Sequence, residues 1–310
     1  MEKRLLLAIC QMYYEQNMTQ QQISKETGLS RMKISRTLQK AREDNIVKII
    51  IDYSGTYPEL ENTLKNHFHL DHVIIAENCI DGDSRKQVES VAALHLMDRL
   101  FDGATVAVGW GTTLLEMSNY LRATEIKDLL FAPIIGGHSI SLSHVHCSSI
   151  ASRIAHKVGG RSISFNAPAL VKNLNEKESF LKDDSIRLVI DHCRRADIAV
   201  FSLGNPTYSS STIHRVEYFT DDDLHTLKDN QAVCDLVSIA FLNPQGEECC
   251  KAITDRTIGI TPADLKGIAK KICVAEGESK HPSILAALRA GYVNDLITDK
   301  ATADYLIQNL

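Results

Sequence analysis

Apolar positions near the N-terminus recur with the spacing of amphipathic helices. The first stripe predicts a supporting helix and consists of Leu5, Leu6, Ile9, Met12 and Tyr13. A second set can form a small core shared by two short crossed helices, and its members are Ile23, Leu29, Ile34 and Leu38. Gly28 supplies the turn between those two helices. Residues 19–39 therefore predict a helix-turn-helix, and the apolar run at 46–51 predicts a strand like the wing of a winged helix.

Beyond residue 58, helical stripes alternate with short apolar runs. Residues 58–68 and 87–100 have helical spacing. The apolar runs predict buried strands at 73–76, 106–108, 129–135, 198–203, 236–242, 272–275 and 296–298. Helices between buried strands are typical of a doubly wound parallel sheet of the α/β class. We therefore predict a winged helix-turn-helix domain at 1–52, a Gly- and Pro-containing linker at 53–58, and a second domain at 59–310.

Composition and charge are consistent with two domains of different kinds. The chain has 310 residues, of which 44% are hydrophobic, and no apolar run is long enough to span a bilayer. No small-residue cleavage site follows the apolar N-terminal segment, so we expect a cytoplasmic protein without a membrane partner. Residues 1–52 hold nine Lys or Arg and six Asp or Glu, whereas the whole chain has a net charge of −5. A weakly basic head on an acidic body suits a protein that contacts DNA with one end.

The eight cysteines have no paired metal-binding or redox spacing. A chain of this size can fold without disulfides, so reduced and mostly buried thiols are expected. The arrangement closest to a metal site is made of His138, His144, His146 and Cys147. Metal sites with these ligands usually show tighter or repeated spacing, and we expect neither a metal nor a cofactor.

The second helix of the predicted motif has polar and cationic residues outside its core positions. Ser30 is a plausible N-cap for that helix. Arginine and lysine suit guanine and phosphate, and serine and threonine suit the DNA backbone. The residues expected to contact double-stranded operator DNA are Thr19, Gln20, Ser30, Arg31, Lys33, Ser35 and Arg36. An ordinary amphipathic helix pair with a solvated charged face is the alternative.

Two loops that connect a strand to a helix could bind an anion. Gly109-Trp-Gly-Thr-Thr113 follows an apolar strand, and its hydroxyls and the amides that open the next helix can donate to phosphate oxygens. This loop lacks the lysine of a P-loop, but Lys280 in the second loop could supply the charge if the strand order brings the two loops together. The alternatives are a structural turn at 109–113 and a solvated Lys280.

Four sequence blocks together resemble the SorC-type sugar-binding transcriptional regulators of bacteria, a group that also includes DeoR-like proteins. The blocks are the head residues 19–36, Val108-Gly-Trp-Gly-Thr-Thr113, Pro133-Ile-Ile-Gly-Gly137 and the C-terminal residues 275–299. The resemblance implies an effector and oligomerisation domain similar to sugar-phosphate isomerases and deaminases. It also implies a homotetramer or dimer that binds a phosphorylated sugar and, as a repressor, is released from its operator by this inducer.

The resemblance extends to individual effector-binding residues. It implies that phosphate is held by Gly111, Thr112, Thr113 and Lys280, and that Asp235 binds sugar hydroxyls. It further implies that Gly136 and Gly137 let the backbone approach the ligand. Glu276 departs from the pattern, because the family commonly has glycine there, and its carboxylate could bind a hydroxyl or repel a second phosphate.

An enzyme is the competing interpretation, because the same sheet architecture also carries sugar-phosphate isomerisation and deamination. These reactions need a positioned base near a carbonyl. After the strand that ends at Leu203, the chain lacks the Asp-Gly-His constellation of the related deaminases. The carboxylates at 221–223 are better explained as a helix N-terminus, so we predict a regulator without catalytic residues.

Overall fold

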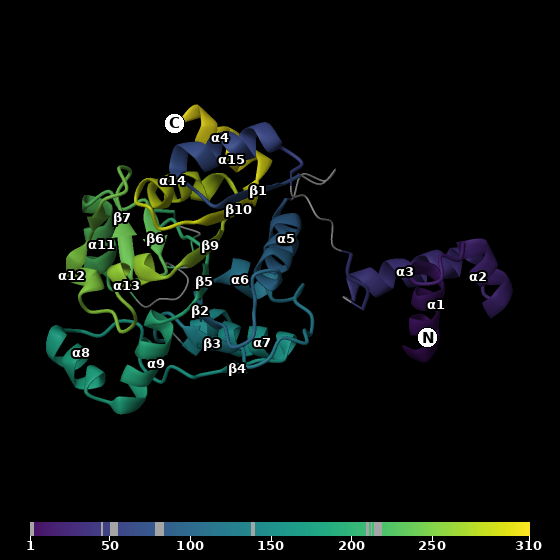
Figure 1. The fold of residues 1–310 in the computed structure, drawn as a ribbon, viewed down its shortest axis with the longest axis horizontal. Coiled ribbons are helices and arrows are strands. Elements are labelled where there is room, and N and C mark those ends of the chain that lie inside the picture. Colours follow the sequence, from purple (N-terminus) through teal and green to yellow (C-terminus); the bar gives the residue numbers. More distant parts are fainter. Residues whose placement is uncertain are drawn as a thin grey trace. The chain divides into compact units, whose positions relative to one another are not determined.

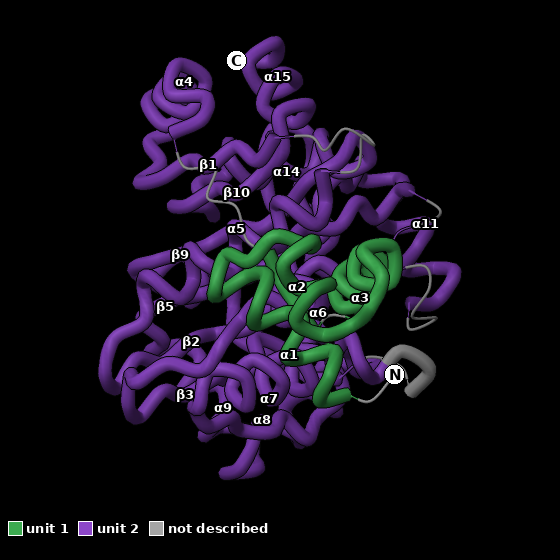
Figure 2. Tube along the Cα trace, turned by 90° about the vertical axis from the view of Figure 1, so that its right-hand side faces the viewer, with its two compact units in different colours: residues 1–50 green, residues 51–310 purple. Residues whose placement is uncertain are grey.

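The computed structural model describes residues 3–44, 46–49, 55–77, 84–137, 140–208, 211, 213 and 219–310. The chain divides into two compact units, which are residues 1–50 and 51–310 (Figure 2). We refer to them as the head and the body.

Three short helices form the head, and they confirm the predicted helix-turn-helix. The helices are α1 (Lys3–Tyr14), α2 (Gln20–Thr27) and α3 (Arg31–Glu43). Their shared core contains the predicted Ile9, Ile23, Ile34 and Leu38, together with Leu6, Cys10 and Ala41. Gly28 ends α2 with φ 71°, a left-handed conformation that glycine adopts without a steric penalty.

Polar caps fix the starts of α2 and α3. Thr19 and Gln22 form a capping box in which the Thr19 amide donates to Gln22 Oε1 at 2.8 Å and the Gln22 amide donates to Thr19 Oγ1 at 3.3 Å. Ser30 caps α3, as predicted, because its Oγ accepts a hydrogen bond from the Lys33 amide at 3.3 Å. Each cap thus fixes the residue at which its helix begins.

The predicted wing strand at 46–51 is not seen at the described positions 46–49. Instead, the amides of Ile46 and Val47 both donate to the carbonyl oxygen of Ala41, at 2.8 and 2.9 Å, so the chain turns back on the end of α3. Val47 packs against the core of the head. Residues 50 and 51 lie outside the described part of the chain.

A seven-stranded parallel sheet forms the centre of the body, in the order β1-β10-β9-β5-β2-β3-β4 (Figure 1). All six pairs of neighbouring strands are parallel. The strands are β1 (His72–Ala76), β2 (Thr105–Val108), β3 (Leu130–Pro133), β4 (Arg161–Ser162), β5 (Ile198–Phe201), β9 (Lys270–Val274) and β10 (Asp295–Asp299). Apart from β4, each of these strands was predicted to within a few residues.

Alternate residues of the strands point into two separate cores, and helices cover both faces of the sheet. One core includes helices α5 (Arg85–Met97), α6 (Thr112–Met117) and α7 (Cys147–Val158). The other includes α4 (Pro58–Phe68), α9 (Asp184–Arg194), α13 (Pro262–Gly267), α14 (His281–Arg289) and α15 (Lys300–Gln308). This arrangement confirms the predicted doubly wound α/β fold.

The body also contains a small antiparallel sheet. Its strands are β6 (Cys234–Leu236), β7 (Ala240–Leu242) and β8 (Glu248–Cys249). Further helices in the described residues are α8 (Leu174–Leu181), α11 (Asp221–Asp229), α12 (Lys251–Thr254) and the 3₁₀ helices η1 (Ile140–Val145) and η2 (Glu278–Lys280). The carboxylates at 221–223 open α11, as the sequence indicated, and Thr220 forms a capping box with Asp223.

The prediction of one buried parallel strand at 236–242 was wrong. The chain instead makes an antiparallel hairpin, in which Leu236 pairs with Ala240. Val237 and Ser238 turn it with φ of 53° and 57°, a conformation that usually favours glycine or asparagine. Since the turn lacks those residues, its sequence resembled a continuous strand.

Candidate functional site

Three neighbouring strands of the large sheet bring the predicted anion-binding loops together. The strands β9, β5 and β2 lie side by side. The two predicted loops follow β2 and β9 at their carboxyl ends, and a third loop, which begins at Ser202, follows β5 between them. The chain leaves β2 towards β3 and β4 on one side, whereas β5 returns to the other side of β2 (Figure 1). Open α/β sheets bind ligands at such a change of direction, outside the carboxyl ends of the strands.

Lys280 lies between hydroxyl groups from the other two loops. Its Nζ donates to Thr113 Oγ1 at 3.1 Å and to Ser202 Oγ at 3.4 Å. Thr113 and Ser202 are both buried. Burial lowers the pKa of the Lys280 ammonium, and the nearby Glu276 carboxylate partly opposes this shift. A partly buried ammonium surrounded by hydroxyl groups favours an anionic ligand. The alternative of a solvated Lys280 does not agree with these contacts.

The sequence analysis did not identify Ser202. This residue comes directly after β5, and its place in the site depends on β5 lying between β2 and β9. Short apolar runs do not reveal strand order, so the position at a strand end was the only available signal.

Gly111, Thr112 and Thr113 belong to the loop that follows β2 and opens α6. Gly111 is the N-cap of α6, and its amide donates to the carbonyl oxygen of Val145 at 3.0 Å. Thr112 is exposed, whereas Thr113 is buried against Lys280. The first amides of a helix have no intrahelical acceptor, so α6 can add backbone donors to the hydroxyls and the ammonium.

Glu276 follows β9 and is nearly buried. Arg85, the first residue of α5, donates from Nε to Glu276 Oε1 at 3.3 Å. The Arg85 guanidinium therefore offsets the negative charge of Glu276, for which the sequence left open whether it binds a sugar hydroxyl or repels a second phosphate. Arg85 was not identified from the sequence, since it lies about 190 positions away from Glu276.

Asp235 is buried in β6 beside the loop that follows β5. Asp235 and Gly204 exchange two backbone hydrogen bonds, of 2.8 and 3.0 Å. The Ser238 amide donates to Asp235 Oδ1 at 2.6 Å, so the turn of the hairpin also holds this carboxyl group. Burial raises the pKa of Asp235 to about 7, although the hydrogen bonds from Ser238 act in the opposite direction. A carboxyl group with this pKa can accept or donate a hydrogen bond near neutral pH.

As the pH rises from 5.5 to 7.5, the free energy of unfolding is expected to fall less in Asp235→Asn than in the unaltered protein. The folded carboxyl has a pKa near 7, above its ordinary value, so its contribution is greatest in acid and is lost as the pH rises through about 7. Relative to the variant, the free energy of unfolding of the unaltered protein changes by up to about 1.4 kcal/mol per pH unit, which amounts to roughly 2 kcal/mol over this range. Urea unfolding followed by the fluorescence of Trp110, the single tryptophan, measures it. Parallel pH profiles for both proteins would contradict the raised pKa.

Gly136 and Gly137 are engaged within the protein. The Gly136 amide donates to Ile258 O at 3.0 Å, and the Gly137 amide donates to Ala167 O at 2.9 Å. A Cβ atom at position 136 would lie 2.5 Å from Ala167 O, so close packing of two backbone segments explains this glycine. Neither amide is available to a ligand in this arrangement, which leaves these two residues a role in shaping the loop.

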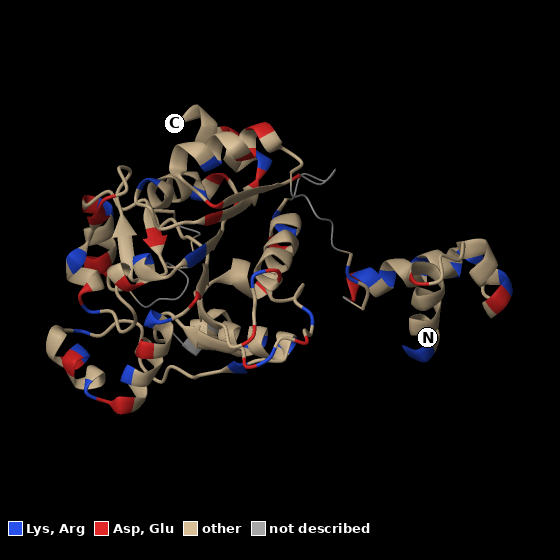
Figure 3. Cartoon of the chain, viewed as in Figure 1, with Lys and Arg blue, Asp and Glu red and all other residues tan. Residues whose placement is uncertain are grey.

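The predicted DNA-contacting residues of α3 lie outside the core of the head. Arg31, Lys33, Ser35 and Arg36 are all exposed, whereas Ile34, Thr37, Leu38 and Ala41 are buried. The helix has five basic residues and one acidic residue (Figure 3). This concentration of positive charge on one exposed helix suits the phosphate-rich surface of DNA.

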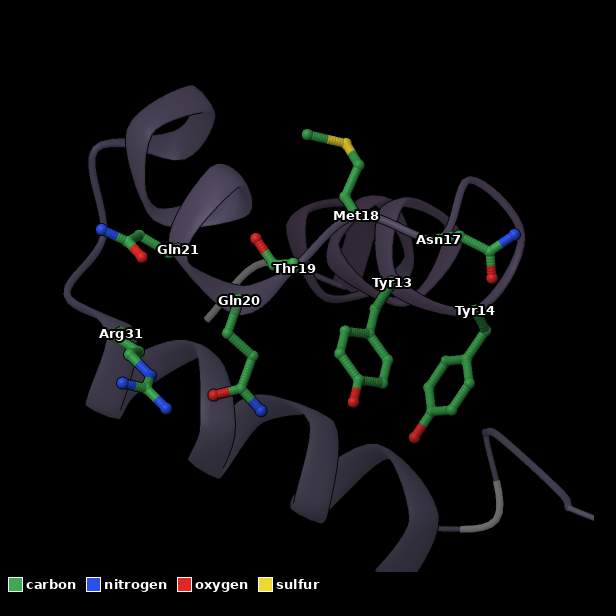
Figure 4. Close-up of a pocket in the computed structure, with 8 residues that line it drawn as sticks. All are labelled: Tyr13, Tyr14, Asn17, Met18, Thr19, Gln20, Gln21 and Arg31. Atoms are coloured by element: carbon green, nitrogen blue, oxygen red, sulfur yellow. The ribbon is translucent and has the colours of Figure 1, made fainter.

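A groove of about 680 Å³ adjoins the start of α2 and the start of α3. It is lined by the predicted Thr19, Gln20 and Arg31, and also by Tyr13 and Tyr14. Figure 4 shows the polar ends of Tyr13, Tyr14 and Gln20 directed the same way. Tyr13 was placed in the supporting stripe by its spacing, and Tyr14 was not identified from the sequence. Spacing does not show where the hydroxyl end of a half-buried tyrosine points.

Among the described residues, one group has the spacing of metal ligands, and it consists of His72, His95 and Asp295. Asp295 already accepts hydrogen bonds from Arg99 at 2.8 Å, and this fixed positive charge disfavours a bound cation. In the histidine cluster noted from the sequence, Cys147 is buried, and burial raises its pKa to about 12. His138 of that cluster lies outside the described residues.

No helix in the described part of the chain has the length and apolar character needed to cross a bilayer.

Two family models match the chain, and together they cover the head and the body. Residues 55–308 match the family described as "Putative sugar-binding domain". Residues 8–44 match region 4 of the sigma-70 factors.

Individual relatives align over nearly the whole chain. The sorbitol operon regulator of Klebsiella pneumoniae is 30% identical, with 98% of each chain covered. The deoxyribonucleoside regulator of Bacillus subtilis is 29% identical over 100% of this chain and 99% of its own. The crystal structure of the full-length Klebsiella pneumoniae regulator superposes with a TM-score of 0.78 at 28% identity, and 99% of each chain is covered.

Proposed function

Because this chain belongs to the SorC family of sugar-binding transcriptional regulators, we propose that its affinity for operator DNA is controlled by a phosphorylated sugar. The relatives named above are, by name, a sorbitol operon regulator and a deoxyribonucleoside regulator. The corresponding role here is control of carbohydrate genes. The observation that carries the phosphate part of the proposal is the contact of Lys280 with the hydroxyls of Thr113 and Ser202.

The chemistry of this cluster favours phosphate over a neutral sugar hydroxyl. A phosphate group can accept hydrogen bonds from Lys280, from the two hydroxyls and from the first amides of α6. Its negative charge would also restore the pKa of the partly buried ammonium, which burial alone lowers. Asp235 and Glu276 are the acceptors proposed for sugar hydroxyls.

Ligand binding in the body changes DNA affinity if it stabilises one arrangement of the domains in an oligomer. A dimer or tetramer presents several heads to the operator, and its symmetry is matched by a pseudo-palindromic site. We propose release from DNA, that is, repression relieved by the inducer. Titration of a panel of sugar phosphates and free sugars into an operator-binding assay tests this. A complex unaffected by the whole panel would refute control by a phosphorylated sugar.

An enzyme remains the alternative function, and it makes a different prediction. Gly204-Asn-Pro follows β5 in place of a catalytic Asp-Gly-His loop, and Asp223 of the acidic run is used in the cap of α11. We therefore propose that the full-length chain binds sugar phosphates without converting them. Turnover of any sugar phosphate, detected by NMR of the incubated mixture, would favour the enzyme.

Arg36→Ala is expected to weaken operator binding roughly tenfold, since a base or phosphate contact by arginine contributes about 1–3 kcal/mol. Arg36 is exposed on α3, and its loss leaves the core of the head intact. Fluorescence anisotropy with a labelled operator gives the dissociation constant. Lys182→Ala is the control, because it removes an exposed positive charge from the body. Similar weakening by both variants would show that only overall charge matters.

A further inference from the structure

Met32 is an apolar residue on the surface of the head. Its relative exposure is 66%, the highest among the large hydrophobic residues that the structure describes. It is the second residue of α3, directly after Arg31, and the Ser30 cap holds this first turn in place. An apolar side chain is therefore presented to solvent at the end of α3 where helix-turn-helix proteins contact bases.

The helical geometry places Met32 in the middle of the outward face of α3. Successive residues are 100° apart around a helix, so residues three, four and seven positions further on share its face. Those residues are Ser35, Arg36 and Gln39, all of which are exposed. The buried Ile34, Leu38 and Ala41 lie on the opposite side. Met32 is thus flanked by polar side chains that suit DNA.

We propose that Met32 contacts the C5-methyl group of a thymine in the major groove and so contributes to operator specificity. The thymine methyl is the one apolar group that base pairs offer in this groove, and it distinguishes an A·T pair from its inverse and from both G·C pairs. The long, unbranched side chain of methionine can adapt to a methyl group without a polar partner. The inference rests on the DNA-binding function proposed above.

An exposed methionine with no role is the alternative, because single apolar residues are common on protein surfaces. Its position argues for contact with DNA. An apolar side chain in the first turn of α3 would enter the groove together with Arg36 and would lose its contact with water there. Burial of Met32 against a base without a methyl group would add no sequence specificity. The two interpretations therefore differ in whether binding depends on the methyl group of a thymine.

Deletion of single methyl groups from the DNA tests the proposal. The bound sequence is first selected by the full-length protein from a random pool of DNA duplexes. Each thymine of that sequence is then replaced by deoxyuridine, which differs only in lacking the methyl group. For the unaltered protein, one or two replacements per half-site are expected to weaken binding about fourfold, the effect of one buried methyl group.

The same replacements are then measured with Met32→Ala, Met32→Leu and the control Leu188→Ala, which removes an exposed apolar side chain from the body. At the sensitive thymine, Met32→Ala should make deoxyuridine and thymine equivalent, whereas Met32→Leu and Leu188→Ala should retain the difference. The Met32 variants should have the same thermal midpoint of unfolding as the unaltered protein, since the Met32 side chain is exposed.

The outcomes separate the inference from the function on which it rests. Failure to select any sequence would refute the proposed DNA-binding function. The role of Met32 alone would be refuted by a selected sequence that responds to the loss of its methyl groups equally in Met32→Ala and in the unaltered protein. A selected sequence without any sensitive thymine would refute it as well.

Discussion

Lys280→Met is expected to shift the response of operator binding to much higher concentrations of the phosphorylated effector and to leave operator binding itself intact. The substitution keeps the length of the side chain but removes the ammonium that contacts Thr113 and Ser202. Hydrogen bonds to charged groups contribute about 1.5–3 kcal/mol each, so effector affinity should fall by roughly 10- to 150-fold. The quenching or enhancement of Trp110 fluorescence on titration reports binding, because Trp110 adjoins Gly111 in the same loop.

Lys271→Met provides a matched control for this experiment. Lys271 is also a buried lysine, but it lies near the start of β9 and donates to the carbonyl oxygens of Lys266 and Ile268. Its loss should affect stability without changing effector affinity. An unchanged effector affinity in Lys280→Met would contradict the proposed phosphate site, whereas loss of operator binding in the same variant would indicate damage to the fold.

Asp295→Asn is expected to destabilise the body by about 3 kcal/mol, the usual cost of removing one partner from a buried ion pair. Asp295 lies at the start of β10, where Oδ2 accepts from His95 at 2.7 Å and from Arg99 at 2.8 Å, and Oδ1 contacts His72 Nδ1 at 3.1 Å. The side chains of Asp295 and His95 are only 4% and 5% exposed. The asparagine cannot balance the charge of Arg99. Urea unfolding monitored by Trp110 gives the change in the free energy of unfolding.

The pH dependence of this group has the opposite sign to that of Asp235. Burial alone would raise the pKa of Asp295, but the contacts with His95, His72 and Arg99 lower it overall. A lowered pKa means that the stabilisation is present above the ordinary carboxyl pKa and is lost as the pH falls through the folded value. Asp304→Asn is the control, since the side chains of Lys300 and Asp304 are 31% and 44% exposed, far more than those of Asp295 and His95, and their pair should contribute less than about 1 kcal/mol. If Asp295→Asn and Asp304→Asn lowered the free energy of unfolding equally, burial of the ion pair would not explain the effect at Asp295.

The helix-turn-helix could be predicted because its signals are local. The apolar spacing, the N-cap at Ser30 and the turn at Gly28 all lie within about 20 residues and agree with one another. The wing was predicted from an apolar run alone. A strand needs a partner to satisfy its backbone, and the amides of Ile46 and Val47 bond instead to Ala41.

The parallel strands were also predictable, since buried strands between helices have a distinctive pattern. The run at 236–242 was misleading because Val237 and Ser238 adopt left-handed backbone conformations without the usual glycine or asparagine. The hydrogen bond from the Ser238 amide to Asp235 stabilises that turn. The carboxyl group proposed to bind sugar hydroxyls is thus held by the feature that the pattern could not reveal.

The sequence by itself determined the class of fold, the exposed basic face of the second motif helix and the choice of Thr113 and Lys280, but not of Ser202, as residues proposed to hold an anion. Tertiary structure alone decided which of those residues meet. Lys280 reaches Thr113 and Ser202 across 167 and 78 positions of the chain, and it does so only because β9, β5 and β2 are neighbours in the sheet. Local patterns report helix and strand periodicity, whereas strand order results from packing of the whole domain.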